Sequence, residues 1–173
     1  RRGSIVTIDA PLDAAVIGAG PAGLMAAEMI SDAGLSVAVF EAMPSPARKF
    51  LMAGKSGLNI THVATPAELA VIYPDALASL SQAVEAFGPD EIMAWMEQLD
   101  IQPVTGPTGR VFPREMKASP LLRAWLSRLA DAGARLHTRH RWTGWDQDGA
   151  LTFDTPDGPR HVSSRSQGFA LGG

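Results

Sequence analysis

The sequence predicts an α/β fold in which helices cover a parallel sheet and a β-meander follows. Two features near the N-terminus favour it. An apolar segment, 14–17, runs directly into glycines with G-x-G-x-x-G spacing at Gly18, Gly20 and Gly23. A helix-forming segment follows, and a second apolar segment, 35–40, comes after it. This order of strand, turn, helix and strand is typical of a Rossmann-like dinucleotide-binding unit.

The three glycines meet the requirements of a diphosphate site. Gly18 permits a sharp turn, Gly20 lets a diphosphate approach the backbone, and Gly23 lets the helix lie against the strand, because no Cβ intrudes. The first N–H groups of the helix have no partner within it, and the helix dipole adds a partial positive charge there. We therefore expect an anion to bind at the start of this helix.

Glu41 directly follows the second apolar segment. It lies 23 positions after Gly18 (41 − 18), close to the spacing of about 20 at which such units place an acid that accepts hydrogen bonds from a ribose diol. The alternative is an ordinary βαβ unit with an exposed glutamate. We favour the ribose site because strand, glycines, helix and acid all fall in register.

A long irregular segment, 42–67, follows Glu41. It contains three basic residues and no acidic one. Among its small, polar and basic residues are Arg48, Lys49, Gly54, Lys55, Ser56, Gly57, Asn59 and Thr61. Long loops inside a domain are usually functional, so we predict a second phosphate or ring cradle here. A solvated surface loop is the alternative.

Hydrophobic periodicity and turn signals predict the remaining elements. Helices are expected over 66–71, 75–86, 89–100 and 118–132. Turn and strand signals alternate over 101–113. Short strands are expected over 135–140, 141–146, 150–155 and 168–171, with hairpin turns at 146–149 and 156–159. These strands predict an antiparallel β-meander after the last helix.

The composition limits the possible classes of protein. The 173 residues are 46% hydrophobic and 19% charged with a net charge of −3, which is typical of a globular domain without a basic field for nucleic acid. The absence of cysteine excludes disulfides and thiolate chemistry, so redox chemistry requires a cofactor. No apolar segment fits a membrane span or signal peptide, which predicts a cytoplasmic protein without a membrane partner. Arg123 and Arg128 are interpreted as charges on an exposed helix face.

The sequence identifies no catalytic acid or base and no metal site. His62 lies in the 42–67 segment, but a histidine in a loop is usually just solvated. His137, His140 and His161 lie on or beside predicted strands, without a carboxylate at triad-like spacing.

Several sequence blocks together resemble the BaiN-like (aminoacetone-oxidase-type) FAD-dependent oxidoreductases. The blocks are Gly18-Ala19-Gly20-Pro21-Ala22-Gly23, Glu41, Arg48-Lys49-Phe50-Leu51-Met52-Ala53-Gly54, Leu58-Asn59-Ile60-Thr61, Gly109-Arg110-Val111-Phe112-Pro113 and Ala170-Leu171-Gly172-Gly173. The resemblance spans residues 13–173. The blocks that begin at Arg48 and Gly109 are more specific than the glycine pattern.

The resemblance implies a glutathione-reductase-like FAD domain with FAD as cofactor and NAD(P)H as a candidate electron donor. Residues 1–12 would form a loose terminus, and 13–173 would form the N-terminal segment of the FAD domain. An inserted substrate domain and a C-terminal FAD segment would then be absent from this chain, and the fold would be incomplete.

The resemblance also assigns cofactor-binding residues. Those for the diphosphate are Gly18, Ala19, Gly20, Pro21, Ala22 and Gly23, and Glu41 with the adjacent Ala42 would bind the adenosine ribose. Those for the ribityl chain and the isoalloxazine ring are Arg48, Lys49, Gly54, Lys55, Ser56, Asn59 and Thr61. The backbone near Trp142 would meet the adenine, and Gly172 would begin a second turn against the cofactor. Many relatives have Gly-Gly-Arg-Cys-Asn at 55–59, so this chain lacks that arginine and cysteine.

Two alternatives to a flavoprotein oxidoreductase stay open. An NAD-dependent dehydrogenase uses the same glycine pattern, although its domain would usually continue as βαβ units. A non-catalytic dinucleotide-binding module would retain the fold without completing an active site. The substrate and the oligomeric state do not follow from the sequence.

Overall fold

The computed structural model describes residues 11–53, 57–65, 67–68, 71 and 78–172. The chain divides into two compact units. Unit 1 comprises Arg1–Phe50 and Leu126–Gly173, and unit 2 comprises Leu51–Trp125. Helices α2 (Arg48–Ala53) and α6 (Ala118–Asp131) each run across the boundary between the units.

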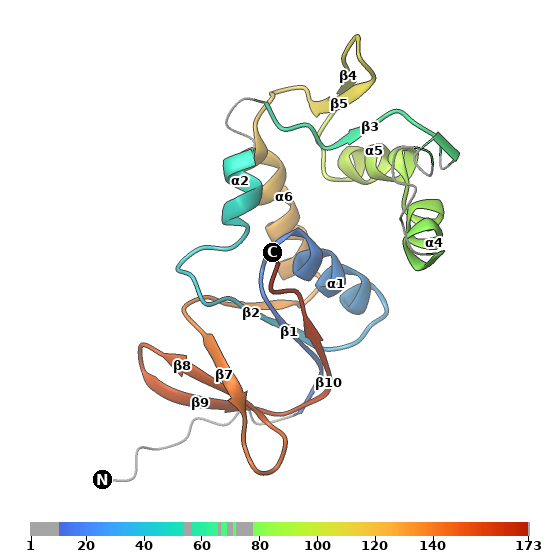
Figure 1. Cartoon of the computed structure of the whole chain (residues 1–173). Coiled ribbons are helices and arrows are strands. Elements are labelled where there is room, and N and C mark those ends of the chain that lie inside the picture. The colour runs from blue at the N-terminus through green and yellow to red at the C-terminus, as the bar shows by residue number, and fades with distance from the viewer. Residues whose placement is uncertain (1–10, 54–56, 66, 69–70, 72–77, 173) are drawn as a thin grey trace. The chain divides into compact units, whose positions relative to one another are not determined.

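A four-stranded sheet forms the centre of unit 1 (Figure 1). Its strands, in spatial order, are β10 (Ser164–Phe169), β1 (Leu12–Ile17), β2 (Val37–Phe40) and β6 (Arg135–His137). All three pairings in this sheet are parallel. Every residue of β2 is buried, and β1 is buried at all positions except one. Such uninterrupted burial is expected of parallel strands that are covered on both faces.

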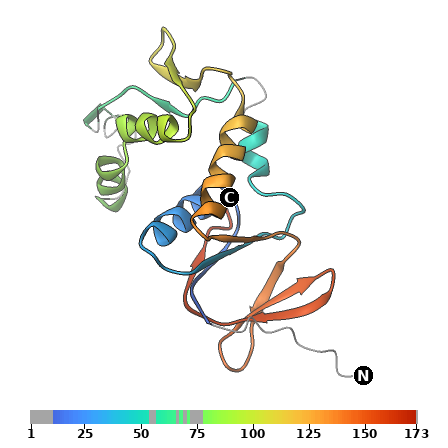
Figure 2. The same cartoon turned by 180° about the vertical axis from the view of Figure 1, so that it is seen from behind.

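Different elements cover the two faces of this sheet. Helix α1 (Pro21–Asp32) lies on one face, with Leu24 and Ala27 buried, and the view from behind in Figure 2 shows the same arrangement. The other face carries an antiparallel meander of β7 (Arg141–Trp145), β8 (Leu151–Thr155) and β9 (Gly158–Val162). The core shared by sheet and meander consists of Leu12, Ala15, Ile17, Ala38, Phe40, Leu151, Phe153 and Val162.

Unit 2 combines a small antiparallel sheet with helices. Its elements in chain order are β3 (Thr61–His62), α4 (Ala78–Ala86), α5 (Pro89–Gln98), β4 (Pro103–Thr105) and β5 (Arg110–Pro113). The three strands pair in the order β3-β5-β4. Trp95 of α5 meets the ring of Trp125 edge-on, with centroids 4.9 Å apart. This aromatic contact fixes α5 against the first part of α6.

The structure confirms the predicted parallel sheet, its helices and the β-meander. It corrects three local assignments. The sequence predicts 135–140 as the first strand of the meander, but β6 joins the parallel sheet beside β2 instead. The segment 42–67 is not wholly irregular, because it contains α2 and β3, and the last strand begins at Ser164 rather than at residue 168. Half of the predicted helix 66–71, residues 66, 69 and 70, lies outside the described residues.

Candidate functional site

The turn between β1 and α1 is closed too tightly for any side chain at two of its glycines. Gly18 has φ +102°, and a Cβ built on it would lie 2.3 Å from the carbonyl oxygen of Ala170. A Cβ on Gly23 would lie 1.9 Å from the carbonyl oxygen of Gly18. Both distances are far below van der Waals contact. Glycine is therefore required at both positions, as the sequence predicts.

Gly20, the middle glycine of the motif, faces open space. A Cβ built on Gly20 would have no heavy atom within 4 Å among the described residues, and its φ of −78° is available to any residue. Conformation and packing therefore do not explain glycine at this position. A molecule that must approach the backbone does explain it.

At the start of helix α1, beside this open space, lie N–H groups that have no hydrogen-bond partner among the described residues. Gly20 is its N-cap, without a side-chain hydrogen bond from any described residue, and Pro21 follows it. The N–H of Leu24 makes the first bond within the helix, 3.0 Å to the carbonyl oxygen of Gly20. The N–H groups of Ala22 and Gly23 come before that bond and point out of the helix start. Together with the helix dipole, they create a local preference for an anion.

The carboxylate of Glu41 reaches the same turn from the end of β2. Its Oε2 accepts a hydrogen bond from the N–H of Ala19 at 2.9 Å, and its Oε1 accepts one from the N–H of Met43 at 2.8 Å. Each carboxylate oxygen can accept a second hydrogen bond. Glu41 is thus held at the glycine turn, and each of its carboxylate oxygens can still accept one more hydrogen bond. The sequence predicts a ribose acceptor at this position.

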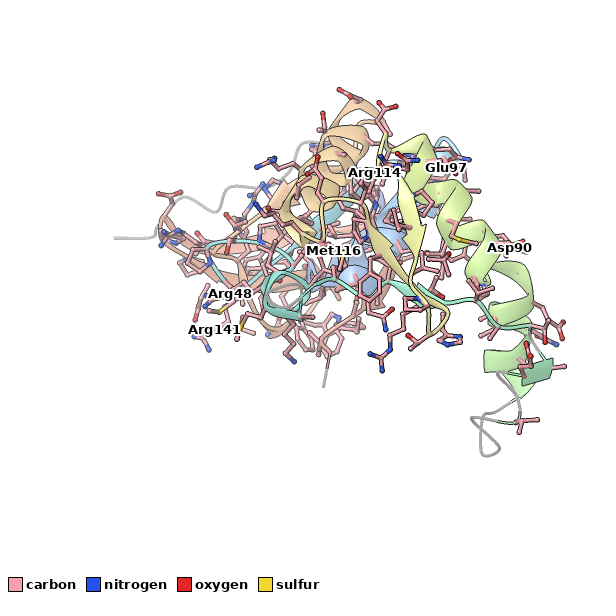
Figure 3. All side chains as sticks on the ribbon, turned by 90° about the horizontal axis from the view of Figure 1, so that it is seen from above. Arg48, Asp90, Glu97, Arg114, Met116 and Arg141 are labelled. Atoms are coloured by element: carbon pink, nitrogen blue, oxygen red, sulfur yellow. The ribbon has the colours of Figure 1, made fainter. Side chains whose placement is uncertain are left out.

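Several other residues of unit 1 that are predicted to bind the cofactor lie at its surface. Ala42, Arg48 and Lys49 are exposed, and Figure 3 labels Arg48 on the outer surface at the start of α2. A Cβ built on Gly172, which has φ +72°, would lie 3.7 Å from Nζ of Lys49. The Lys49 ammonium therefore lies just past the end of β10. This strand also brings the carbonyl of Ala170 against Gly18.

Trp142 has a packing role in the structure. Its ring lies against the buried cluster that joins the sheet and the meander, and its indole N–H donates to the carbonyl oxygen of Gly144 at 2.8 Å. The predicted adenine contact is assigned to the backbone near this residue and not to its ring, so it stays a prediction.

The rest of the predicted site belongs to unit 2 or lies outside the described residues. Asn59 is exposed and Thr61 is half-buried on β3, where Thr61 pairs with Val111. Gly54, Lys55 and Ser56 lie outside the described residues. Their predicted contacts with the ribityl chain and the ring stay predictions.

His62 is fixed by the β-hairpin of unit 2. Its Nε2 lies 2.8 Å from the carbonyl oxygen of Thr108, and its Nδ1 lies 3.1 Å from that of Val63. A Cβ on Gly109 would lie 2.8 Å from the imidazole ring. These contacts explain His62 by the local packing of the hairpin and do not require a catalytic role.

Sequence reasoning misses a histidine–carboxylate pair and several backbone contacts. Nδ1 of His161 lies 2.7 Å from Oδ2 of Asp146, and this hydrogen bond is the main reason why the pKa of Asp146 is lowered. The two residues are far apart in sequence and meet only through the strand pairing of the meander. Ala47 and Ala170 reach the glycine turn through backbone atoms, and Met43 reaches the carboxylate of Glu41 in the same way, so no side-chain signal exists for these contacts.

The described residues contain no group of three or more histidine, aspartate or glutamate side chains arranged to hold a metal ion. None of their helices has both the length and the apolar composition needed to cross a bilayer.

The tight turn, the open space at Gly20, the uncapped helix and the acid at the end of β2 define a dinucleotide-binding domain of the Rossmann type. Residues 12–173 match the family described as the HI0933-like protein Rossmann domain, and the chain belongs to this family. The resemblance to BaiN-like proteins is thereby confirmed, and the fold is that of a FAD-binding Rossmann domain.

Solved structures share this fold at low sequence identity. A THI4 protein from Thermovibrio ammonificans is 17% identical with a TM-score of 0.61, over 94% of this chain and 58% of the other. A 3-ketosteroid-Δ4-(5α)-dehydrogenase from Rhodococcus jostii RHA1 is 15% identical with a TM-score of 0.65, over 91% and 44%. A flavocytochrome c3 fumarate reductase is 16% identical with a TM-score of 0.65, over 95% and 34%. This chain thus spans between about a third and somewhat more than half of the length of these proteins. No curated protein sequence matches it.

Proposed function

We propose that this chain binds FAD as part of a flavoprotein oxidoreductase, which exchanges hydride between the flavin and either NAD(P)H or a small organic substrate. The observation that carries the proposal is the open space at Gly20, bounded by the uncapped start of α1 and the carboxylate of Glu41. Similarity of fold to a ketosteroid dehydrogenase and a fumarate reductase supports a redox role.

The residues around this space suit the adenosine diphosphate half of FAD. The N–H groups of Gly20, Ala22 and Gly23 would donate to the diphosphate, where the helix dipole also favours negative charge. Glu41 would accept hydrogen bonds from the ribose hydroxyls through the lone pairs that Ala19 and Met43 leave unused. A ribose carrying a 2′-phosphate would be repelled by the same carboxylate.

The remaining assignments extend this site toward the flavin. Lys49, whose ammonium lies beside Gly172, would add positive charge at the end of β10. We propose that Arg48, Asn59, Thr61 and the 54–56 segment line the ribityl chain and the ring. The flavin supplies the hydride chemistry when it is bound, and the protein's own part is to bind it, orient it and exclude water.

We further propose that residues 13–173 act as the N-terminal segment of a larger protein. An inserted substrate domain and a C-terminal segment would complete the FAD site. This chain covers 58% or less of the THI4 protein, the ketosteroid dehydrogenase and the fumarate reductase, which supports this organisation. A cytoplasmic location is proposed for the protein as a whole.

The test is to purify the chain, load it with FAD and record its visible absorbance after removal of free flavin. Bound FAD that NADH or NADPH bleaches under anaerobic conditions is the expected result. Bound FAD that neither donor reduces would favour the non-catalytic binding module. A colourless protein that binds NAD instead would favour the dehydrogenase and overturn the proposal, although the meander after α6 already argues against that class.

A further inference from the structure

We propose that Ala47 is a positioning residue for the diphosphate site, and that residues 42–47 form a clasp that fixes the glycine turn before any ligand binds. The inference rests on the proposed binding of FAD. It assigns a role to a segment whose sequence carries no recognisable motif.

The first argument is the contact between Ala47 and the turn. The N–H of Ala47 donates to the carbonyl oxygen of Ala19 at 2.8 Å. Ala47 has φ +52° and is 4% exposed. A residue other than glycine adopts this left-handed conformation only where its surroundings compensate for the strain. The strain at Ala47 is therefore stored at the contact that holds the turn.

The second argument is that Ala19 is held on both sides. Its carbonyl accepts from Ala47, and its N–H donates to Oε2 of Glu41 at 2.9 Å. Ala19 itself is fully buried. Both peptide groups that flank Ala19 are thus fixed. Ala47 of the clasp holds one, and the carboxylate of Glu41 holds the other.

The third argument follows from the planarity of the peptide bond. The carbonyl of Ala19 and the N–H of Gly20 belong to one trans peptide group, so they point in opposite directions. When Ala47 holds the carbonyl, the N–H of Gly20 is turned away from the clasp. Among the described residues this N–H has no hydrogen-bond partner, and the space around Gly20 is open. The clasp therefore orients a free donor toward the diphosphate position.

The clasp is anchored at its other end by backbone hydrogen bonds. The N–H of His140 donates to the carbonyl oxygen of Glu41 at 2.9 Å, and the N–H of Arg139 donates to that of Met43 at 3.1 Å. The N–H of Met43 also donates to Oε1 of Glu41 at 2.8 Å. These bonds tie the clasp to the chain that leaves β6, so it is supported independently of a ligand.

The experiment compares Ala47→Val, Ala47→Gly and Ala33→Val. Valine strongly disfavours a positive φ, whereas glycine accepts it and keeps the N–H donor. Ala33 is an exposed alanine at the C-cap of α1 and provides the matched control. The Kd values for FAD and for ADP are measured on each variant, together with thermal stability and amide hydrogen exchange at residues 19 and 47.

We expect Ala47→Val to raise the Kd for both FAD and ADP about tenfold, equivalent to roughly 1.4 kcal/mol. Ala47→Gly should stay within about twofold of the wild type, and Ala33→Val should bind as the wild type does. Exchange of the Ala19 amide should accelerate in Ala47→Val alone. Because ADP lacks the flavin, its weakened binding would locate the effect at the diphosphate.

Unchanged ADP affinity and unchanged Ala19 exchange in a folded Ala47→Val variant would overturn the clasp. If that variant does not fold, hydrogen exchange of the ligand-free wild type tests the clasp instead. The clasp requires the Ala47 amide to be protected, and exchange at an unprotected rate would refute it. Failure of the wild type to bind FAD or ADP would instead overturn the proposed function, while the exchange data would still test the clasp.

Discussion

Arg128 of α6 forms an ion pair with Glu28 of α1, with Nη2 of the arginine 2.6 Å from Oε1 of the glutamate. The Glu28 side chain is almost completely buried, whereas that of Arg128 is 31% exposed. A buried carboxylate is costly unless cations or donors compensate for its lost hydration. The pair thus joins the helix that leaves the glycine turn to the helix that precedes β6.

Replacing Arg128 by methionine should lower the free energy of unfolding by about 3 kcal/mol, because it removes this compensation from a buried carboxylate. The double variant Glu28→Met with Arg128→Met should recover most of the loss. Arg123→Met, at an exposed position of the same helix, is the control. Urea denaturation measures all three. Equal effects of Arg123→Met and Arg128→Met would show that the pair contributes nothing.

Glu41→Arg should weaken FAD binding at least tenfold, since it removes a charged acceptor from the ribose and from the N–H groups of Ala19 and Met43. Glu97→Arg carries the same change of charge and is the control. Glu97 is exposed on α5, where Figure 3 labels it. Titration of both variants with FAD measures the difference. Retention of FAD by Glu41→Arg at wild-type affinity would contradict the ribose assignment.

The sequence predicts the part of the site whose signals are local. One short stretch of chain contains the apolar strand, the spaced glycines and the acid after the second strand. Their geometry follows from backbone sterics. Gly18, Gly23 and Glu41 consequently stand where the pattern places them.

Features that depend on contacts between distant segments could not be predicted. The pairing of β6 with β2 depends on the crossover through α6, and the polar first part of β10, residues 164–167, is recognisable only beside β1. From its sequence position, Arg128 is interpreted as a surface charge, because its ion pair with Glu28 forms only when α6 packs against α1. Ala47 contacts the turn through its backbone N–H, which every residue except proline possesses.

Gly20→Ala and Gly23→Ala should separate binding from folding. Alanine at Gly20 meets no described atom within 4 Å, so unfolding stability should change by less than about 1 kcal/mol. Its methyl group would occupy the open space, so FAD affinity should fall about tenfold. Alanine at Gly23 would clash with the carbonyl of Gly18 and cost roughly 2–3 kcal/mol of stability. Thermal melts and FAD titration measure both. A Gly20→Ala variant that binds FAD normally would contradict the diphosphate position.

Because the ring of His137 is partly buried, we expect the folding stability of unit 1 to fall at acidic pH. Its ring stacks on Phe40 with centroids 5.0 Å apart, and its Nε2 is buried without a partner among the described residues. Burial, together with the nearby charges of Arg160, His140 and Arg135, lowers the pKa of His137 to about 4.

The unfolded chain, with a histidine pKa near 6.5, binds more protons than the folded chain between the two values. His137 therefore contributes its full stability above about pH 6.5 and loses it as the pH falls toward 4. Since the ring is partly exposed, we expect the loss between pH 7 and pH 5 to be about 1 kcal/mol.

His137→Phe keeps an aromatic ring against Phe40 and removes the titrating group. Carboxylates titrate equally in both proteins, so the difference between their stability profiles isolates His137. The variant should lose less stability than the wild type between pH 7 and pH 5 in urea denaturation, and NMR titration of the wild-type His137 ring should give a midpoint near 4. Parallel profiles together with a midpoint near 6.5 would contradict the prediction, because the imidazolium would then be as well stabilised in the folded protein as in water.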